Sequence, residues 1–347
     1  MRSTPEQQAR AQIDRLLAAV GRQVCAVLDV NIRGAHGVVM TAILLVAAQL
    51  NSLALADVHS SVEPTTDGRG QSFWLALTKD CTVPADESAA DLVSEAIGLL
   101  GSPDPVWRDD VGYGVIASCV YQKKLLDAGQ RREIVDTLTG NLRRGIGEAG
   151  TDTVLLRSFS ALDLSILAAL ELQDPVLDDA GYRRLLDDAL AYLAAERDLR
   201  GIDPQVGWVH ATAHAADLLK FLARDPRFTP ADQARLLDAA WLRMTAPGTP
   251  VFTHAEDERL AAALLSVTRR PDFDPASLDP WLETFVALEK RVWQQSPPEA
   301  TSLDAAQNAR NLLRSLHLLL AMPKPDQTPD QLVAREKVLA TLQQIRR

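Results

Sequence analysis

The chain has 347 residues, 47% of them hydrophobic, which is enough to bury a large core in one elongated domain or two compact ones. Its net charge of −10 argues against nucleic acid and anionic lipid as partners, because both bind basic surfaces. Aromatic residues make up only 5%, which favours helices over β-sandwiches and barrels.

The first 56 residues predict an N-terminal overhang followed by a signal peptide or membrane anchor. Residues 38–50 (VVMTAILLVAAQL) form an apolar run that is short for a membrane-spanning helix, and Ala54-x-Ala56 fits a signal-peptidase site. We therefore expect a periplasmic or secreted protein that contacts no membrane beyond this segment. The alternative is a cytoplasmic protein whose start is misassigned, or whose apolar run is a buried helix.

Residues 57–72 (DVHSSVEPTTDGRGQS) are polar and rich in turn-forming residues, which predicts a linker. Only two cysteines, Cys81 and Cys119, follow the expected leader. In an oxidising compartment such a pair predicts a disulfide, while two unrelated thiols are the alternative. No cysteine spacing resembles a zinc motif.

Residues 73–347 predict a single all-α domain. Apolar residues recur at helical spacing, and several segments begin with a capping residue followed by proline, as at Thr229-Pro230 and Thr328-Pro329. The expected helices, after an apolar patch at 72–77, are 90–100, 106–122, 129–146, 153–172, 180–199, 206–223, 229–244, 257–270, 275–293, 302–322 and 328–345.

Helix pairs recur roughly every 45 to 50 residues, which is typical of HEAT-like repeats. We therefore expect antiparallel helix pairs stacked as an α-superhelix, whose inner helices line a concave face. A closed α/α toroid has the same rhythm and is the alternative.

The stretch GWVHATAHAADLL (207–219) is the main candidate for a site. On a helix over 206–223, His210, His214 and Asp217 project within an arc of about 60°, because successive residues turn by about 100°. Histidines four residues apart can bind one divalent metal ion, completed by Asp217 or by His254. A satisfied polar network between helices, without metal, is the alternative.

A charged turn directly before this stretch predicts the rim of a pocket or an ion-paired surface turn. Arg157 lies among apolar residues, so we expect it to be partly buried with Asp198 or Glu256 as its partner. An arginine whose guanidinium extends to solvent is the alternative. The full candidate pocket comprises Arg157, Arg197, Asp198, Arg200, Asp203, Trp208, His210, His214, Asp217, His254, Glu256, Asp257 and Arg259.

Three functions fit these residues. The first is a binding module for a protein or small ligand with a polar His/Asp/Arg pocket. The second is a metal-dependent hydrolase using His210, His214 and Asp217 or His254. The third is a carbohydrate-active α/α toroid, in which tryptophans stack on sugars and two carboxyls cleave the bond. The tryptophans concerned are Trp107, Trp208, Trp241 and Trp281.

Four stretches resemble a bacterial family called domain of unknown function 2785. They are DDVGYG (109–114), GTDTVLLRSFSAL (150–162), ERDLRGIDPQVGWVHATAHAADLL (196–219) and EDERLA (256–261). The resemblance runs from about Cys81 to about Trp281, and GW-x-H-x3-H-x2-D is its most specific part. It implies an all-helical domain and no particular reaction.

Overall fold

The computed structural model describes residues 69–322 and 327–345, in which the regular secondary structure is helical apart from two strands of two residues each. The prediction of an all-α fold is confirmed. The expected leader (1–56) and most of the expected linker lie outside the described residues, which belong to one compact unit. Its elements in chain order are α3(Gln71–Asp80), α4(Ala89–Leu99), η1(Val106–Tyr113), α5(Gly114–Ile116), η2(Ala117–Gln122), α6(Ala128–Asn141), α7(Thr153–Glu171), α8(Asp179–Ala195), β1(Ile202–Asp203), β2(Gly207–Trp208), α9(Ala211–Leu222), α10(Pro230–Thr245), α11(Glu256–Thr268), η3(Pro275–Ser277), α12(Leu278–Gln294), α13(Ala300–Ala321) and α14(Pro329–Gln344).

Side-chain caps fix where several helices begin. Thr229 and Thr328 each accept a hydrogen bond from the third helical N–H and form a capping box, with proline at the first helical position. Asp127 caps α6 in the same way with Gln130. These caps satisfy N–H groups that have no partner within the helix, so the two starts predicted from the Thr-Pro pairs are confirmed.

The helix expected over 106–122 is irregular. It consists of two π-helical segments, η1 and η2, on either side of the single turn α5. A disulfide joins Cys119 of η2 to Cys81, which directly follows α3, with the Cα atoms 5.2 Å apart. The bridge ties the irregular segment to α3.

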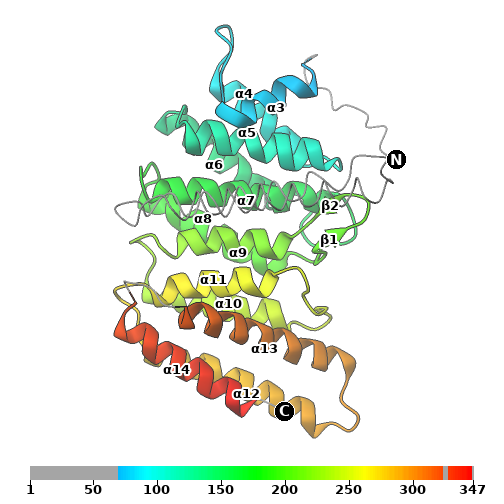
Figure 1. Cartoon of the computed structure of the whole chain (residues 1–347), viewed down its shortest axis with the longest axis vertical. Helices are drawn as coiled ribbons and strands as arrows, with labels where there is room; N and C mark the ends of the chain where they lie inside the picture. Colours follow the sequence, from blue (N-terminus) through cyan, green and yellow to red (C-terminus); the bar gives the residue numbers. More distant parts are fainter. Residues whose placement is uncertain (1–68, 323–326, 346–347) are drawn as a thin grey trace, which may run out of the picture. The chain divides into compact units, whose positions relative to one another are not determined.

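Alternate helices pack side by side. The helix α7 contacts α9, α9 contacts α11, and α11 contacts α13 (Figure 1). The helices α8 and α10 pack against this series from the adjacent layer, α8 on α9 and α10 on α11 and α13. The ends of α7, α9 and α11 are thereby brought together, although they are distant in sequence.

The helix α7 is the centre of the core. It is long and apolar enough to cross a membrane by length and composition, but 78% of its most apolar window is buried within the structure. It also buries four polar side chains completely, namely Arg157, Ser158, Ser160 and Asp163. Burying polar groups costs free energy unless they form hydrogen bonds. The residues that surround these four side chains are therefore the starting point for describing the candidate site.

Candidate functional site

A buried ion pair anchors the long loop between α8 and α9. The Arg157 guanidinium, 0% exposed, donates to both carboxylate oxygens of Glu196 at 2.7 and 3.1 Å. It also donates to the carbonyls of Arg144 and Gly145, each at 2.9 Å. Burial of Arg157 is confirmed, but Asp198 and Glu256 are not its partners: α8 ends at Ala195, which leaves Glu196 beside α7.

Glu196 in turn organises the residues that follow it. Its Oε1 accepts the N–H groups of Arg197 and Asp198 at 2.8 and 2.9 Å, and its carbonyl accepts from Arg243 of α10. The side chain of Arg197 is exposed, so this predicted pocket residue contributes only its main chain. Sequence reasoning placed Glu196 in the charged turn but not in the pocket.

A second set of ion pairs braces the loop from within. Asp198 accepts from Nε and Nη2 of Arg200 and from the amide of Gly150 at 2.9 Å. Arg200 also donates to Asp203 at 2.8 Å. Burial alone would raise the pKa of Asp198, but these hydrogen bonds outweigh it and hold the pKa below its usual range. The three charged side chains thus stabilise the loop rather than line an open pocket.

The loop ends in a short antiparallel hairpin, in which β1 and β2 have two residues each. The buried Arg108 of η1 contacts the turn of this hairpin. Arg108 donates to the carbonyl of Val206 at 2.8 Å. The N–H groups of Val209 and His210 both donate to the carbonyl of Gly201. A side chain at Gly201 would come within 2.4 Å of the His254 ring, so only glycine fits there.

This hairpin changes the expected position of His210. The prediction of a helix over 206–223 is wrong at its start, because α9 begins at Ala211 and Trp208 lies in β2. His210 precedes the helix in the left-handed conformation, with φ of 52°, so it does not share a helical face with His214 and Asp217.

Trp208, His210, His214 and His254 nevertheless meet, and we call these four residues the imidazole cluster. The His210 ring stacks on Trp208 with the ring centres 4.6 Å apart, and His254 meets Trp208 edge-on at 6.0 Å. His210 Nε2 lies 2.5 Å from the carbonyl oxygen of His254 and therefore carries a proton, because a carbonyl only accepts. Glu256, at the start of α11, accepts the N–H of His254 at 2.8 Å.

His214 has a defined tautomer. The Ser158 hydroxyl donates its one proton to the carbonyl of Val209, so it must accept from His214 Nδ1–H at 2.8 Å. Burial, with His210 adding to it, lowers the pKa of His214 to about 3. Although Ser158, His214 and Asp217 are the residue types of a hydrolytic triad, Ser158 is 0% exposed and donates away from His214. The contact is therefore one of packing, not of nucleophile and base.

Asp217 lies one turn further along α9, in an ion-pair group that links α9 to α11. It accepts from Lys220 Nζ at 2.6 Å and pairs with Arg259 of α11. Asp257, two residues before Arg259 on α11, instead accepts from Ser315 of α13 at 2.7 Å.

Two residues that sequence reasoning missed belong near this group. Burial, followed by the charges of Asp163 and Asp217, raises the pKa of the Tyr113 hydroxyl, and the charge of Arg259 opposes this rise. Burial also raises the pKa of Asp163 well above its usual range, and neither carboxyl oxygen has a hydrogen-bond partner among the described residues. Asp163 could have been found from the sequence, because it is the single carboxyl in the apolar stretch 161–170.

The predicted metal ligands do not assemble into one set. Within residues 69–322 and 327–345, no group of three or more His, Cys, Asp or Glu side chains is placed to hold a metal ion. His210, His214 and Asp217 each have the protein partners described above, and His254 Nδ1 lies 3.1 Å from the Thr253 hydroxyl. A metal site at these residues stays a prediction.

The tryptophans considered for sugar stacking are packed into the protein. Trp107 and Trp281 are 1% and 4% exposed and belong to the core. Trp241 meets Phe285 edge-on at 4.7 Å, and one face of Trp208 is covered by His210.

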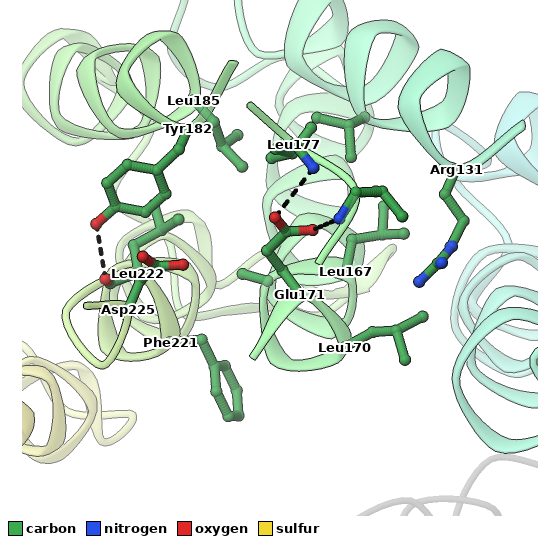
Figure 2. A pocket seen from close by; sticks show the side chains of 13 residues that line it. Arg131, Leu167, Leu170, Glu171, Leu177, Tyr182, Leu185, Phe221, Leu222 and Asp225 are labelled. Carbon is green, nitrogen blue, oxygen red and sulfur yellow. Dashed lines mark hydrogen bonds between the residues drawn. The ribbon is translucent and has the colours of Figure 1, made fainter. Parts of the chain in front are cut away.

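The enclosed pocket in Figure 2 lies at the opposite ends of α7 and α9, far along both helices from the imidazole cluster. Its volume of about 10 Å³ leaves room for one water molecule. Glu171 accepts the N–H groups of Val176 and Leu177, and the Tyr182 hydroxyl donates to the carbonyl of Leu222 (Figure 2). None of the predicted site residues lines this pocket.

Comparison with known proteins gives one match. A family model described as "Protein of unknown function (DUF2785)" matches residues 142–318, which include every candidate residue of the predicted pocket. No curated protein and no solved structure matches the chain.

We predict that Arg157→Met lowers the free energy of unfolding by about 3 to 5 kcal/mol, because it leaves the Glu196 carboxylate buried without its cation. Arg143→Met is the matched control: it removes an ion pair with Asp188 in which Arg143 is 67% exposed, and should cost about 1 kcal/mol or less. Urea unfolding measures both. Equal losses would show that the buried pair is not the anchor.

His214→Asn should make the protein less sensitive to acid, because it keeps an N–H for Ser158 but cannot titrate. Native His214 stays neutral down to about pH 3, whereas the unfolded chain takes up a proton near pH 6.5. This residue's contribution to stability is therefore lost as the pH falls from 6.5 towards 3. Between pH 7 and 5, wild type should lose about 2 kcal/mol more free energy of unfolding than the variant. Parallel losses would contradict the lowered pKa.

Proposed function

The chain belongs to the family described as Protein of unknown function (DUF2785), and from the geometry of its site we propose that it is an exported, HEAT-like helical-repeat module that binds a small polar ligand. The ligand surface is the seam between α9 and α11 around Arg259, rather than the imidazole cluster. The observation that carries the proposal is the environment of Arg259. Asp217 holds its guanidinium in place, but most of its N–H groups have no hydrogen bond within the described residues.

Arg259 is fixed by Asp217, yet its side chain remains 38% exposed. Only Nη1 is engaged, and its other N–H groups make no hydrogen bond within the described part of the chain. A guanidinium that is oriented by one carboxylate and still offers donors to solvent is prepared for a ligand, because its rotamer entropy has already been lost. Tyr113 is half-buried, and Arg259 is one of the charges that act on its hydroxyl.

The arrangement of helices supports the repeat architecture. Contacts run from α7 to α9 to α11 to α13, with α8 and α10 packed against this series, as expected when helix pairs stack. In such a stack one set of helices forms a continuous surface, and the seam between α9 and α11 lies in its middle. Binding by a surface of this kind needs no catalytic group.

The disulfide between Cys81 and Cys119 supports export, because disulfides persist in oxidising compartments such as the periplasm. The apolar run 38–50 and the Ala54-x-Ala56 pattern supply the sequence argument for the same conclusion.

A thermal-shift screen of small polar compounds tests the binding proposal, with Arg259→Met beside wild type and Arg143→Met as control. A ligand at about 100 times its Kd should stabilise wild type by about 2.7 kcal/mol. The shift should disappear in Arg259→Met and persist in the control. A library without any stabilising compound, or with compounds that act equally on Arg259→Met, would contradict the proposal.

Export has its own test. N-terminal sequencing of the protein exported by its native host should begin near Asp57, directly after the Ala54-x-Ala56 pattern. An intact Met1 on protein recovered from the cytosol would overturn this part of the proposal.

A further inference from the structure

Three cations line the seam between α9 and α11, and we call Lys220, Arg224 and Arg259 the basic row. Lys220 lies in α9, Arg224 follows its end, and Arg259 lies in the first turn of α11. Asp217 links Lys220 to Arg259, and Arg224 Nε donates to the Ser266 hydroxyl of α11 at 3.1 Å. The row therefore has members on both sides of the seam, towards the C-terminal end of α9.

The charges along this seam do not balance. Asp217 is the one carboxylate that pairs with the row among the described residues, and Arg269 adds a further positive charge near Arg224. In the groove of about 390 Å³ between α6 and α8, by contrast, three arginines face three aspartates. A local excess of cations is unusual in a chain with a net charge of −10.

These cations are also partly withdrawn from water. The Lys220 side chain is only 13% exposed, and Arg224 is half-buried. Burial lowers the pKa of Lys220, and the nearby Arg224 and Arg259 add to this against Asp217. Burial, followed by Arg269, likewise lowers the pKa of Arg224. Holding like charges together away from water destabilises the fold unless a counter-charge joins them.

The row is held in one arrangement while its donors stay available. The Phe221 ring contacts both cations, with Lys220 Nζ at 4.7 Å and the Arg224 guanidinium at 4.9 Å from the ring centre. Ser266 accepts from Arg224 and donates to the carbonyl of Ala262. The two terminal amino groups of Arg224 make no hydrogen bond within the described residues, so they can reach a ligand that lies on the seam.

We propose that the basic row binds an oxyanion, the phosphate or carboxylate group of a small anionic molecule. This inference rests on the proposed binding function and names the chemistry of its ligand. Arginine donors in a planar fork match the oxygens of either group, and Lys220 supplies a point charge beside them. The bound anion supplies the counter-charge that the seam lacks.

Equilibrium dialysis of the full chain against labelled orthophosphate and, separately, labelled citrate tests the inference at low ionic strength. We expect one saturable site per chain for at least one of the two anions, and the better binder identifies the group. Lys220→Met/Arg224→Met should weaken binding about tenfold or more, because it removes two cations whose hydrogen bonds to an anion are charge-assisted. Arg143→Met/Arg184→Met removes two arginines from the α6–α8 groove and should leave binding unchanged.

Arg259→Gln is a second, independent variant that removes charge from the α11 side of the seam and should also weaken binding. Circular dichroism and urea unfolding show whether each variant is folded. Absence of saturable binding by both anions, or equal weakening in the groove variant, would overturn the inference. If neither anion binds but an uncharged or cationic compound does, and Arg259→Gln abolishes that binding, the proposed binding function stands. Only the inference that the ligand is an oxyanion then fails.

Discussion

The buried ion pair between Arg157 and Glu196 is the constraint on which the rest of the site depends. It joins the second turn of α7 to the first residue after α8, and through Glu196 it fixes the amides of Arg197 and Asp198. The loop that follows is thereby directed back across the ends of α7 and α9, where Gly201 accepts the amides that precede α9. A buried pair of this kind adds little net stability, but breaking it leaves a charge without a partner. The position of the imidazole cluster and the start of α9 follow from this anchor.

Much of the fold was predictable from the sequence because its determinants are local. Helical periodicity and Thr-Pro starts indicated α10 and α14 at the residues where the structure begins them. The start of α9 was not predictable in the same way. Residues 206–210 have a helical pattern, yet they form β2 and a left-handed turn, because hydrogen bonds to Gly201 and Arg108 compete with the helix. Arg108 and Val206 are 98 residues apart in the sequence, so no local pattern reveals the hydrogen bond between them.

The sequence predicted most residues of the candidate site, but not which of them bind one another and which keep donors available for a ligand. The sequence placed His210, His214 and His254 near one another, and they do meet. They form a packed network, in which His210 and His214 donate ring N–H groups to acceptors within the protein. Lys220 and Arg224 were overlooked, although Lys220 lies three residues after Asp217 on α9, and Arg224, seven residues after Asp217, follows just past the end of α9. The partner of Arg157 was assigned wrongly because it depends on where α8 ends. The polar residues thus separate into a set that shapes the loop and a half-buried row of cations in which two arginines keep N–H groups without a hydrogen bond among the described residues.

A crystal structure of the protein soaked with pyrophosphate or citrate at low ionic strength would test this separation most directly. The account predicts an oxyanion within hydrogen-bond distance of Arg224 and Lys220 or Arg259, with the contact between His214 and Ser158 unchanged. An oxyanion bound instead by His210 and His254, with their rings turned away from Trp208 and Glu256, would contradict the account.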